Sequence, residues 1–299
     1  MATKHDEPWL AEFRACWVAD RRDDALALLE SRSSKHAGTP KAADKSAAAN
    51  AIRSTIDAPA KLLGLCATLA AAKSPTRREL ACVLLRDCYE ADRERVLELA
   101  LALSDDEHWE TRLWAGDLVS NLLGRHFDQL YPVLQRWAVH ESQFVRVAVA
   151  TSVRDVAHKK HPERCGPLLD LIEPLVGDDA HEVQRNLGGY AVGGALLGMC
   201  PDETLTRVRK WARADDEATR WNTAMVFSAA PARKHVDSGL ELLSDLARDG
   251  RKHVWQAVST ALRNLAKGDP ERVAPVLRSW LKDERKLPAA LALRSIERA

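Results

Sequence analysis

The sequence predicts an all-α protein built as an α-solenoid, a superhelix of stacked two-helix repeats. Apolar residues in segment 144–162 recur at i, i+3, i+4, i+8 and i+11, the spacing that lines one face of a helix. Similar segments recur with a period in the thirties, which is typical of such repeats. No segment alternates with a period of two over a useful length, so we expect essentially no sheet. A repeat array of this kind allows all 299 residues to form one domain.

Composition predicts a soluble, cytoplasmic protein. Basic residues number 44 and acidic residues 43, so the chain as a whole lacks the basic excess of many nucleic-acid-binding proteins. The polar start predicts no secretory signal, and the longest apolar run, 62–72, is far shorter than the ~20 residues of a membrane span. The six cysteines are far apart and lie mostly among apolar residues, so we expect reduced core thiols and no disulfide framework.

The N-terminal quarter divides into three segments. Residues 1–30 are expected to form cap helices over the first repeat, with Trp9, Phe13 and Trp17 at spacings of four. Residues 31–46, rich in serine, lysine, glycine and proline, predict a loop or mobile linker that is solvated. Residues 47–75 are expected to be leading helices with a break at Pro59.

Residues 76–299 are expected to form about six HEAT-like repeats. The period fits tetratricopeptide repeats too, but their tryptophan–leucine–glycine–tyrosine pattern is absent. One position near the start of each first helix serves as an anchor, and the anchors are Arg77, Thr111, Val145, Val183, Thr219 and Val254.

Two kinds of residue mark the repeat boundaries. Aspartates precede the first helices, where a carboxylate can accept hydrogen bonds from free backbone N–H groups, at 105–106, 178–179, 215–216 and 249. Trp137, Trp211 and Trp280 stand near the ends of second helices, which predicts packing between repeats. Neither set needs a catalytic role.

A column of arginines follows the anchors and is the main candidate binding surface. The residues one place after each anchor are Arg78, Arg112, Arg146, Gln184, Arg220 and Trp255. Arg185 and Trp221 come one place later, and Trp109 and Trp114 interleave with the column. Guanidinium groups beside aromatic planes suit a phosphate backbone with an exposed base. Alternatively, the arginines bind loop aspartates and join the repeats.

Segments 145–163 and 254–280 resemble helices of the HEAT-like repeat DNA glycosylases of bacterial DNA alkylation repair. The similarity spans roughly residues 75–285 and implies a groove that holds duplex DNA. Active members hydrolyse the N-glycosidic bond of alkylated purines without a cofactor. Glu110 and Asp155 are the candidate catalytic carboxylates that the resemblance implies. The residues expected to contact DNA are Arg78, Trp109, Arg112, Trp114, Arg146, Arg185, Arg220, Trp221 and Trp255.

This chain departs from the family pattern at two cleft positions. Leu113 stands where one branch has its functional aspartate, and Gly188-Gly189-Tyr190 stands where that branch has a second cleft tryptophan. The helix expected over 182–198 holds five glycines, which predicts either close helix packing or room for a bulky ligand. His158 and His161 lack a third ligand nearby in the sequence, so we expect no metal.

Two functions remain open. The leading hypothesis is a monomeric protein that binds duplex DNA. This hypothesis leaves open whether the protein also has glycosylase activity. The alternative is a noncatalytic scaffold that binds a protein segment in its groove, which the near-zero net charge and the two departures favour.

Overall fold

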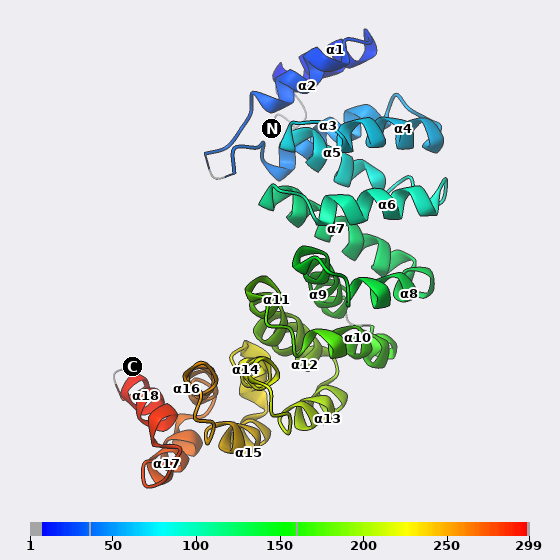
Figure 1. Ribbon diagram of the computed structural model, residues 1–299. Helices are drawn as coiled ribbons and strands as arrows, with labels where there is room; N and C mark the ends of the chain where they lie inside the picture. Colours follow the sequence, from blue (N-terminus) through cyan, green and yellow to red (C-terminus); the bar gives the residue numbers. More distant parts are fainter. Residues whose placement is uncertain (1–7, 36, 160, 298–299) are drawn as a thin grey trace. The chain divides into compact units, whose positions relative to one another are not determined.

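The computed structural model describes residues 8–35, 37–159 and 161–297, and every regular element in these ranges is helical. The chain divides into two compact units, unit 1 up to Arg125 and unit 2 from His126 onward. Within each unit, successive helices stack on one another (Figure 1). The predicted all-α solenoid class is therefore confirmed. None of the described helices has the length and apolar character needed to cross a bilayer.

Unit 1 is a stack in which α1, α3, α5 and α7 follow one another as the first helices of successive pairs. Its helices are α1 (Pro8–Val18), α2 (Arg22–Glu30), α3 (Ala42–Arg53), α4 (Pro59–Ala70), α5 (Pro75–Leu85), α6 (Arg93–Ser104) and α7 (Trp109–Arg125). The cap predicted at the N-terminus is α1 with α2. Its Trp17 is buried, and the indole Nε1 donates a hydrogen bond of 3.0 Å to Thr55 Oγ1 just after α3.

Unit 2 continues the same alternation. Its α-helices are α8 (Phe127–Trp137), α9 (Gln143–His158), α10 (Cys165–Ile172), α11 (His181–Asn186), α12 (Leu197–Met199), α13 (Pro201–Trp211), α14 (Glu217–Val226), α15 (Val236–Leu246), α16 (Lys252–Ala266), α17 (Pro270–Trp280) and α18 (Lys286–Ile296). Three short 3₁₀ turns, η1 (Pro162–Arg164), η2 (Glu173–Leu175) and η4 (Ala230–Lys234), and a π-helix, η3 (Leu187–Leu196), complete it. Helices α9, α11 with η3, α14, α16 and α18 pack in sequence as first helices.

The predicted register agrees with the helix boundaries. Each of the six anchors is the third residue of its helix, from Arg77 in α5 to Val254 in α16. Trp137, Trp211 and Trp280 are the last residues of α8, α13 and α17, and all three are buried, so the prediction that they pack in the core is confirmed. Regular spacing in the sequence thus corresponds to equivalent places in successive pairs.

Segment 31–46 differs from the solvated linker that its composition predicts. Helix α3 starts at Ala42, within the expected linker, because alanines 42 and 43 favour a helix. Thr39 and Pro40 are buried, and the Thr39 hydroxyl donates a hydrogen bond of 3.0 Å to Glu110 Oε2. These residues therefore pack against α7 and are not a simple solvated connection.

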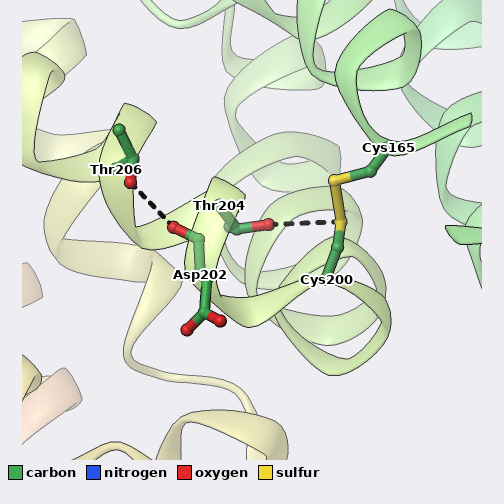
Figure 2. The surroundings of a disulfide bond; sticks show 5 residues. All are labelled: Cys165, Cys200, Asp202, Thr204 and Thr206. Carbon is green, nitrogen blue, oxygen red and sulfur yellow. Dashed lines mark hydrogen bonds between the residues drawn. A yellow bond between two sulfur atoms is a disulfide. The ribbon is translucent and has the colours of Figure 1, made fainter. Parts of the chain in front are cut away.

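One pair of cysteines contradicts the prediction of reduced thiols. Cys165 and Cys200 form a disulfide, shown in Figure 2 with the neighbouring Thr204 hydroxyl. Cys165 opens α10 and Cys200 directly precedes α13, the next second helix, so the two lie one period apart with Cα atoms separated by 6.3 Å, within bonding range. The separation of 35 residues was the available signal. Cys16, Cys66, Cys82 and Cys88 are buried free thiols, as predicted.

Candidate functional site

The arginine column forms hydrogen bonds that join the repeat loops. In Arg78, Arg112, Arg146 and Arg220, the Nη1 group donates to a main-chain carbonyl six residues earlier, in the loop before its own helix. Gln184, at the same position of α11, donates to the Asp178 carbonyl, also six residues earlier. The column therefore satisfies carbonyl groups that the ends of the second helices leave without helical partners.

Three of these arginines also bind a carboxylate in the loop after their repeat. Arg78 donates to Asp106, Arg146 to Asp178 and Arg220 to Asp249, at donor–acceptor distances of 2.5–3.1 Å. The exposed fractions of the three arginine side chains are 8%, 17% and 16%, so most of each side chain is covered. Binding of these residues to DNA remains a prediction, and it would compete with bonds that join the repeats.

These three aspartates and Asp216 accept hydrogen bonds at the starts of the next first helices, as predicted. Asp106 accepts from the His108 N–H, Asp178 from the Ala180 N–H and Asp216 from the Thr219 N–H. Asp249 accepts from the Arg251 N–H and side chain. Hydrogen bonds from the Arg251 side chain, with help from Arg220, lower the pKa of Asp249 to about 2 although burial opposes them.

Candidate residue Glu110 belongs to a buried ionic cluster in unit 1. The Lys45 Nζ lies 2.6 Å from Glu79 Oε2 and 3.0 Å from Glu110 Oε1, and the Lys45 and Glu79 side chains are fully covered. Lys45 also sits 4.6 Å from the centre of the Trp114 ring, a cation–π contact. We call Lys45, Glu79 and Glu110 the lysine cluster. It links α3, α5 and α7.

The two carboxylates of the lysine cluster are shifted in opposite directions. Burial raises the pKa of Glu79 despite its hydrogen bond from Lys45. Burial also acts to raise the pKa of Glu110, but hydrogen bonds from Lys45 and Thr39 outweigh it and hold that pKa below its ordinary value. A catalytic role for Glu110 remains a prediction. In this structure its carboxylate binds the protein's own lysine and threonine.

The other candidate residues of the glycosylase-like site are Trp109 and Trp114 of unit 1 and Asp155 of unit 2. On α7, the Trp109 side chain is 45% exposed beside His108, while Trp114 is half-buried against Lys45. Asp155 lies on α9 in unit 2 and forms an ion pair of 2.8 Å with Arg154. Glu110 and Asp155 therefore belong to different units, and neither unit by itself contains both candidate carboxylates.

The glycine-rich segment is a π-helix, where the sequence predicts an ordinary helix over 182–198. The i→i+5 hydrogen bonds of η3 make each of its turns wider than a turn of an α-helix, and π-helical turns are frequent at functional sites. A Cβ atom at Gly188 would lie 2.5 Å from the Asn222 carbonyl oxygen, and one at Gly193 would lie 2.1 Å from that of Val226. Both glycines thus allow η3 to touch the α14 backbone. The close-packing interpretation is confirmed for this pair.

Two further glycines of η3 line a pocket. Gly189 and Gly194 line a cavity of about 660 Å³ whose other walls come from α11, α14, the following turn and the start of α16. The second interpretation of the glycines, that absent side chains leave room for a ligand, remains a prediction, because a Cβ on Gly189 would lie 2.9 Å from Ser228 Oγ and one on Gly194 would lie 3.2 Å from the Gly189 carbonyl oxygen. This volume lies within the range of typical ligand sites. We call this cavity the glycine pocket.

Aromatic rings and one guanidinium group shape the glycine pocket. The Trp221 ring stacks on His253 with centroids 5.0 Å apart and planes 3° from parallel. Tyr190, 62% exposed, and Arg185 complete these walls. Two predicted DNA contacts, Arg185 and Trp221, thus come together, while Trp255 is half-buried on α16 and does not line the cavity.

Sequence reasoning missed His253, Met225 and Ser228 in this pocket. It also missed Lys45 and Glu79 in the lysine cluster, and Thr39 beside it. His253 directly precedes the anchor Val254, and the same repeat position holds Glu110 in α7. Comparing every column, and not only the arginine column, could have found it. Lys45 gave no such signal because it was assigned to the linker.

A larger cavity of about 990 Å³ lies in unit 1 between α2, α4 and the loop that follows α3. It contains none of the predicted site residues, and its Arg77 is bound to Glu30 and Asp23 at 2.9 and 2.8 Å. Within residues 8–35, 37–159 and 161–297, no group of three His, Cys, Asp or Glu residues is placed to hold a metal ion. The glycine pocket is therefore the stronger candidate.

Comparison with known proteins finds distant structural likeness. No protein family model matches the chain, and no curated protein sequence matches it significantly. The crystal structure of Escherichia coli YibA is 15% identical, with 100% of both chains covered and a TM-score of 0.42. A designed armadillo repeat protein in complex with the peptide (KR)4 is 15% identical, with 75% of this chain and all of that chain covered and a TM-score of 0.35. These values identify neither a family nor a ligand.

Proposed function

We propose that this protein is a noncatalytic helical repeat scaffold whose glycine pocket binds a segment of a partner protein. The observation that carries the proposal is the pocket itself, where glycines expose backbone beside the stacked Trp221 and His253 rings. Rigid aromatic side chains in a concave site supply large contact area at low entropic cost, and such residues dominate many protein interfaces. The predicted catalytic carboxylates Glu110 and Asp155 lie outside this pocket.

The proposal is tested with a displayed library of random peptides selected on the purified protein. Selected peptides are then measured by fluorescence anisotropy against Trp221→Ala and against Trp255→Ala, a matched tryptophan on a neighbouring first helix outside the pocket. Loss of a central aromatic anchor costs roughly 10-fold or more in affinity. We expect that loss for Trp221→Ala and little change for Trp255→Ala. Peptides that bind both variants like the wild type would exclude the pocket as their site.

A second candidate is duplex DNA binding, which the DNA alkylation repair resemblance implies. The observation that favours it is the joint presence of Arg185 and Trp221 at one cavity, since a guanidinium and an aromatic ring suit phosphate and base. Binding through the whole column would weaken steeply with salt and would depend on Trp255 as well as on Trp221. Release of methylated base from methylated DNA, abolished by Glu110→Gln or Asp155→Asn, would establish glycosylase activity. A cytoplasmic location and a monomeric state also remain proposals.

A further inference from the structure

The charge around the glycine pocket favours one class of peptide. None of the described residues that line the pocket is acidic, and Arg185 is the lining residue that carries a permanent positive charge. His181 and His253 add imidazole rings, which donate hydrogen bonds in either tautomer. A basic segment would therefore meet Arg185 without a lining carboxylate to offset it, whereas an acidic segment gains a charged partner.

Arg185 differs from the column arginines in how it is held. Its side chain is 61% exposed, and its Nη1 lies 3.5 Å from both carboxylate oxygens of Glu182, the long limit of a hydrogen bond. Arg146 and Arg220, by contrast, bind aspartates at 2.5 Å and are mostly covered. An exposed pair of this kind contributes little to stability. The Arg185 guanidinium can thus exchange Glu182 for a ligand carboxylate at low cost.

The walls and floor favour an aromatic group next to that carboxylate. Trp221 is fixed by stacking on His253, so its ring presents a preformed edge and face for a second aromatic ring. At the floor, a Cβ on Gly189 would lie 2.9 Å from Ser228 Oγ, so a side chain at this position would collide with Ser228 unless one of the two moved. The volume of about 660 Å³ exceeds what one planar ring needs and leaves room for flanking residues.

We infer that the glycine pocket binds a partner segment in which an aromatic side chain is flanked by aspartate or glutamate. The aromatic ring packs against Trp221, and a neighbouring carboxylate binds Arg185 in a charge-assisted, bidentate pair. This inference rests on the proposed function, because it specifies the peptide that the same pocket takes. On this inference, Arg185 selects acidic over basic segments, and the ring contact with Trp221 supplies most of the binding affinity.

The test uses three synthetic peptides with the full-length protein: one with an Asp-Phe-Glu core, one with both acids replaced by lysine, and one with the phenylalanine replaced by alanine. We expect the first peptide to bind at least about 10-fold more tightly than the other two, because each of the other peptides lacks one of the two contacts. Arg185→Glu should reverse the preference between the acidic and the lysine peptide. The matched control, Arg263→Glu on the exposed surface of α16, should leave the preference unchanged.

The possible failures are distinguishable. If the lysine peptide binds the wild type as tightly as the acidic peptide and Trp221→Ala weakens both, the charge inference is wrong and the proposed function stands. If no peptide, including any selected from the library, depends on Trp221, the proposed function fails with it. If an oligonucleotide displaces the acidic peptide and its own binding depends on Arg185 and Trp221, the occupant is nucleic acid and the inference is overturned.

Discussion

The corresponding surface of the first helices is closed in unit 1 and open in unit 2. Glu79 of α5, Arg185 of α11 and Trp221 of α14 occupy one repeat position, two residues after their anchors. Glu79 is fully buried against Lys45, whereas Arg185 and Trp221 line the glycine pocket. The residue type at this position does not decide its role. What decides it is whether a neighbouring segment, here Thr39 and Lys45, supplies partners from within the chain.

The two units also use their charges differently. In unit 1 the lysine cluster places three ionisable groups in or near the interior, where each charge needs its partners to offset the cost of desolvation. Column arginines join loops in both units, as Arg78 does in unit 1 and as Arg146 and Arg220 do in unit 2. In unit 2, in addition, the charge of Arg185 at the glycine pocket is held by a long contact with Glu182. The stability of unit 1 should therefore be sensitive to the loss of one charge. The stability of unit 2 should be sensitive to changes in its π-helix and to reduction of its disulfide.

The largest effect is expected from Lys45→Met, which would leave the carboxylates of Glu79 and Glu110 without their shared cation. Breaking a buried ion pair from one side costs about 3–5 kcal/mol, so unit 1 should lose most of its stability. Denaturant unfolding monitored by hydrogen exchange would locate the loss. Lys41→Met, an exposed lysine of the same segment, is the control and should change little. A loss below about 1 kcal/mol for Lys45→Met would mean that the cluster contributes little.

Reduction of the Cys165–Cys200 disulfide should lower the stability of unit 2 and leave unit 1 unchanged. A bond that closes a loop of this length stabilises by about 2–4 kcal/mol in most proteins. Protein denatured in an alkylating agent should take up four labels before reduction and six after it, since four of the six cysteines are free. Six labels without reduction would show that the bond is absent, and the stability difference should then vanish.

Gly193→Ala should destabilise unit 2 by roughly 1–3 kcal/mol, because its new methyl group would overlap the Val226 carbonyl oxygen and force η3 from α14. Gly64→Ala in α4 of unit 1 is the matched contrast, since its methyl group meets no atom within 4 Å. There the change should stabilise by up to about 1 kcal/mol through helix propensity. Thermal melts of both variants check the pair. Equal effects at the two sites would contradict the close contact between η3 and α14.

The smallest expected effect is the loss of folding stability at low pH. The pKa of Asp249 is lowered in the folded state, so its contribution to stability is present above the unfolded value near 4 and is lost as pH falls towards about 2. The loss should be at most about 2 kcal/mol. In unit 1, the lowered pKa of Glu110 means that its contribution to stability is also lost as pH falls. The raised pKa of Glu79 has the opposite effect, because its protonation at low pH favours the folded state. Unit 2 should thus weaken first. Asp249→Asn should remove part of the loss of stability between pH 5 and pH 2, because the pKa values of Glu173 and Asp283 in this unit are lowered as well.

The helical architecture could be predicted because it depends on local, repeated patterns. The anchors, the aspartates before the first helices and the tryptophans that end second helices all followed from spacing, since each repeat places the same residue type in the same environment. The arginine column was found in the same way, and its bonds to the loops agree with the joining role that was one of the two interpretations.

The sites were harder to predict because they depend on exceptions to the repeat. Lys45 contacts Glu79, one period away, and Glu110, 65 positions away, but the composition of segment 31–46 predicts a linker and therefore hides these contacts. The π-helix arises where four glycines weaken ordinary helix propensity and close packing against α14 compensates, which depends on tertiary structure. The disulfide was missed although its spacing matched the period, because the wide separation of the cysteines was read as evidence against pairing.

The π-helix makes the glycine pocket easy to gain or lose during evolution. A single-codon deletion within the stretch that encodes residues 187–196 would allow the segment to return to α-helical hydrogen bonding. Every later residue of that helix would then turn by about 100° around its axis. The arginine bonds that join the loops lie outside this stretch and would survive. A lineage could therefore discard the pocket in one mutational step while it keeps a folded scaffold, and could regain it by one insertion.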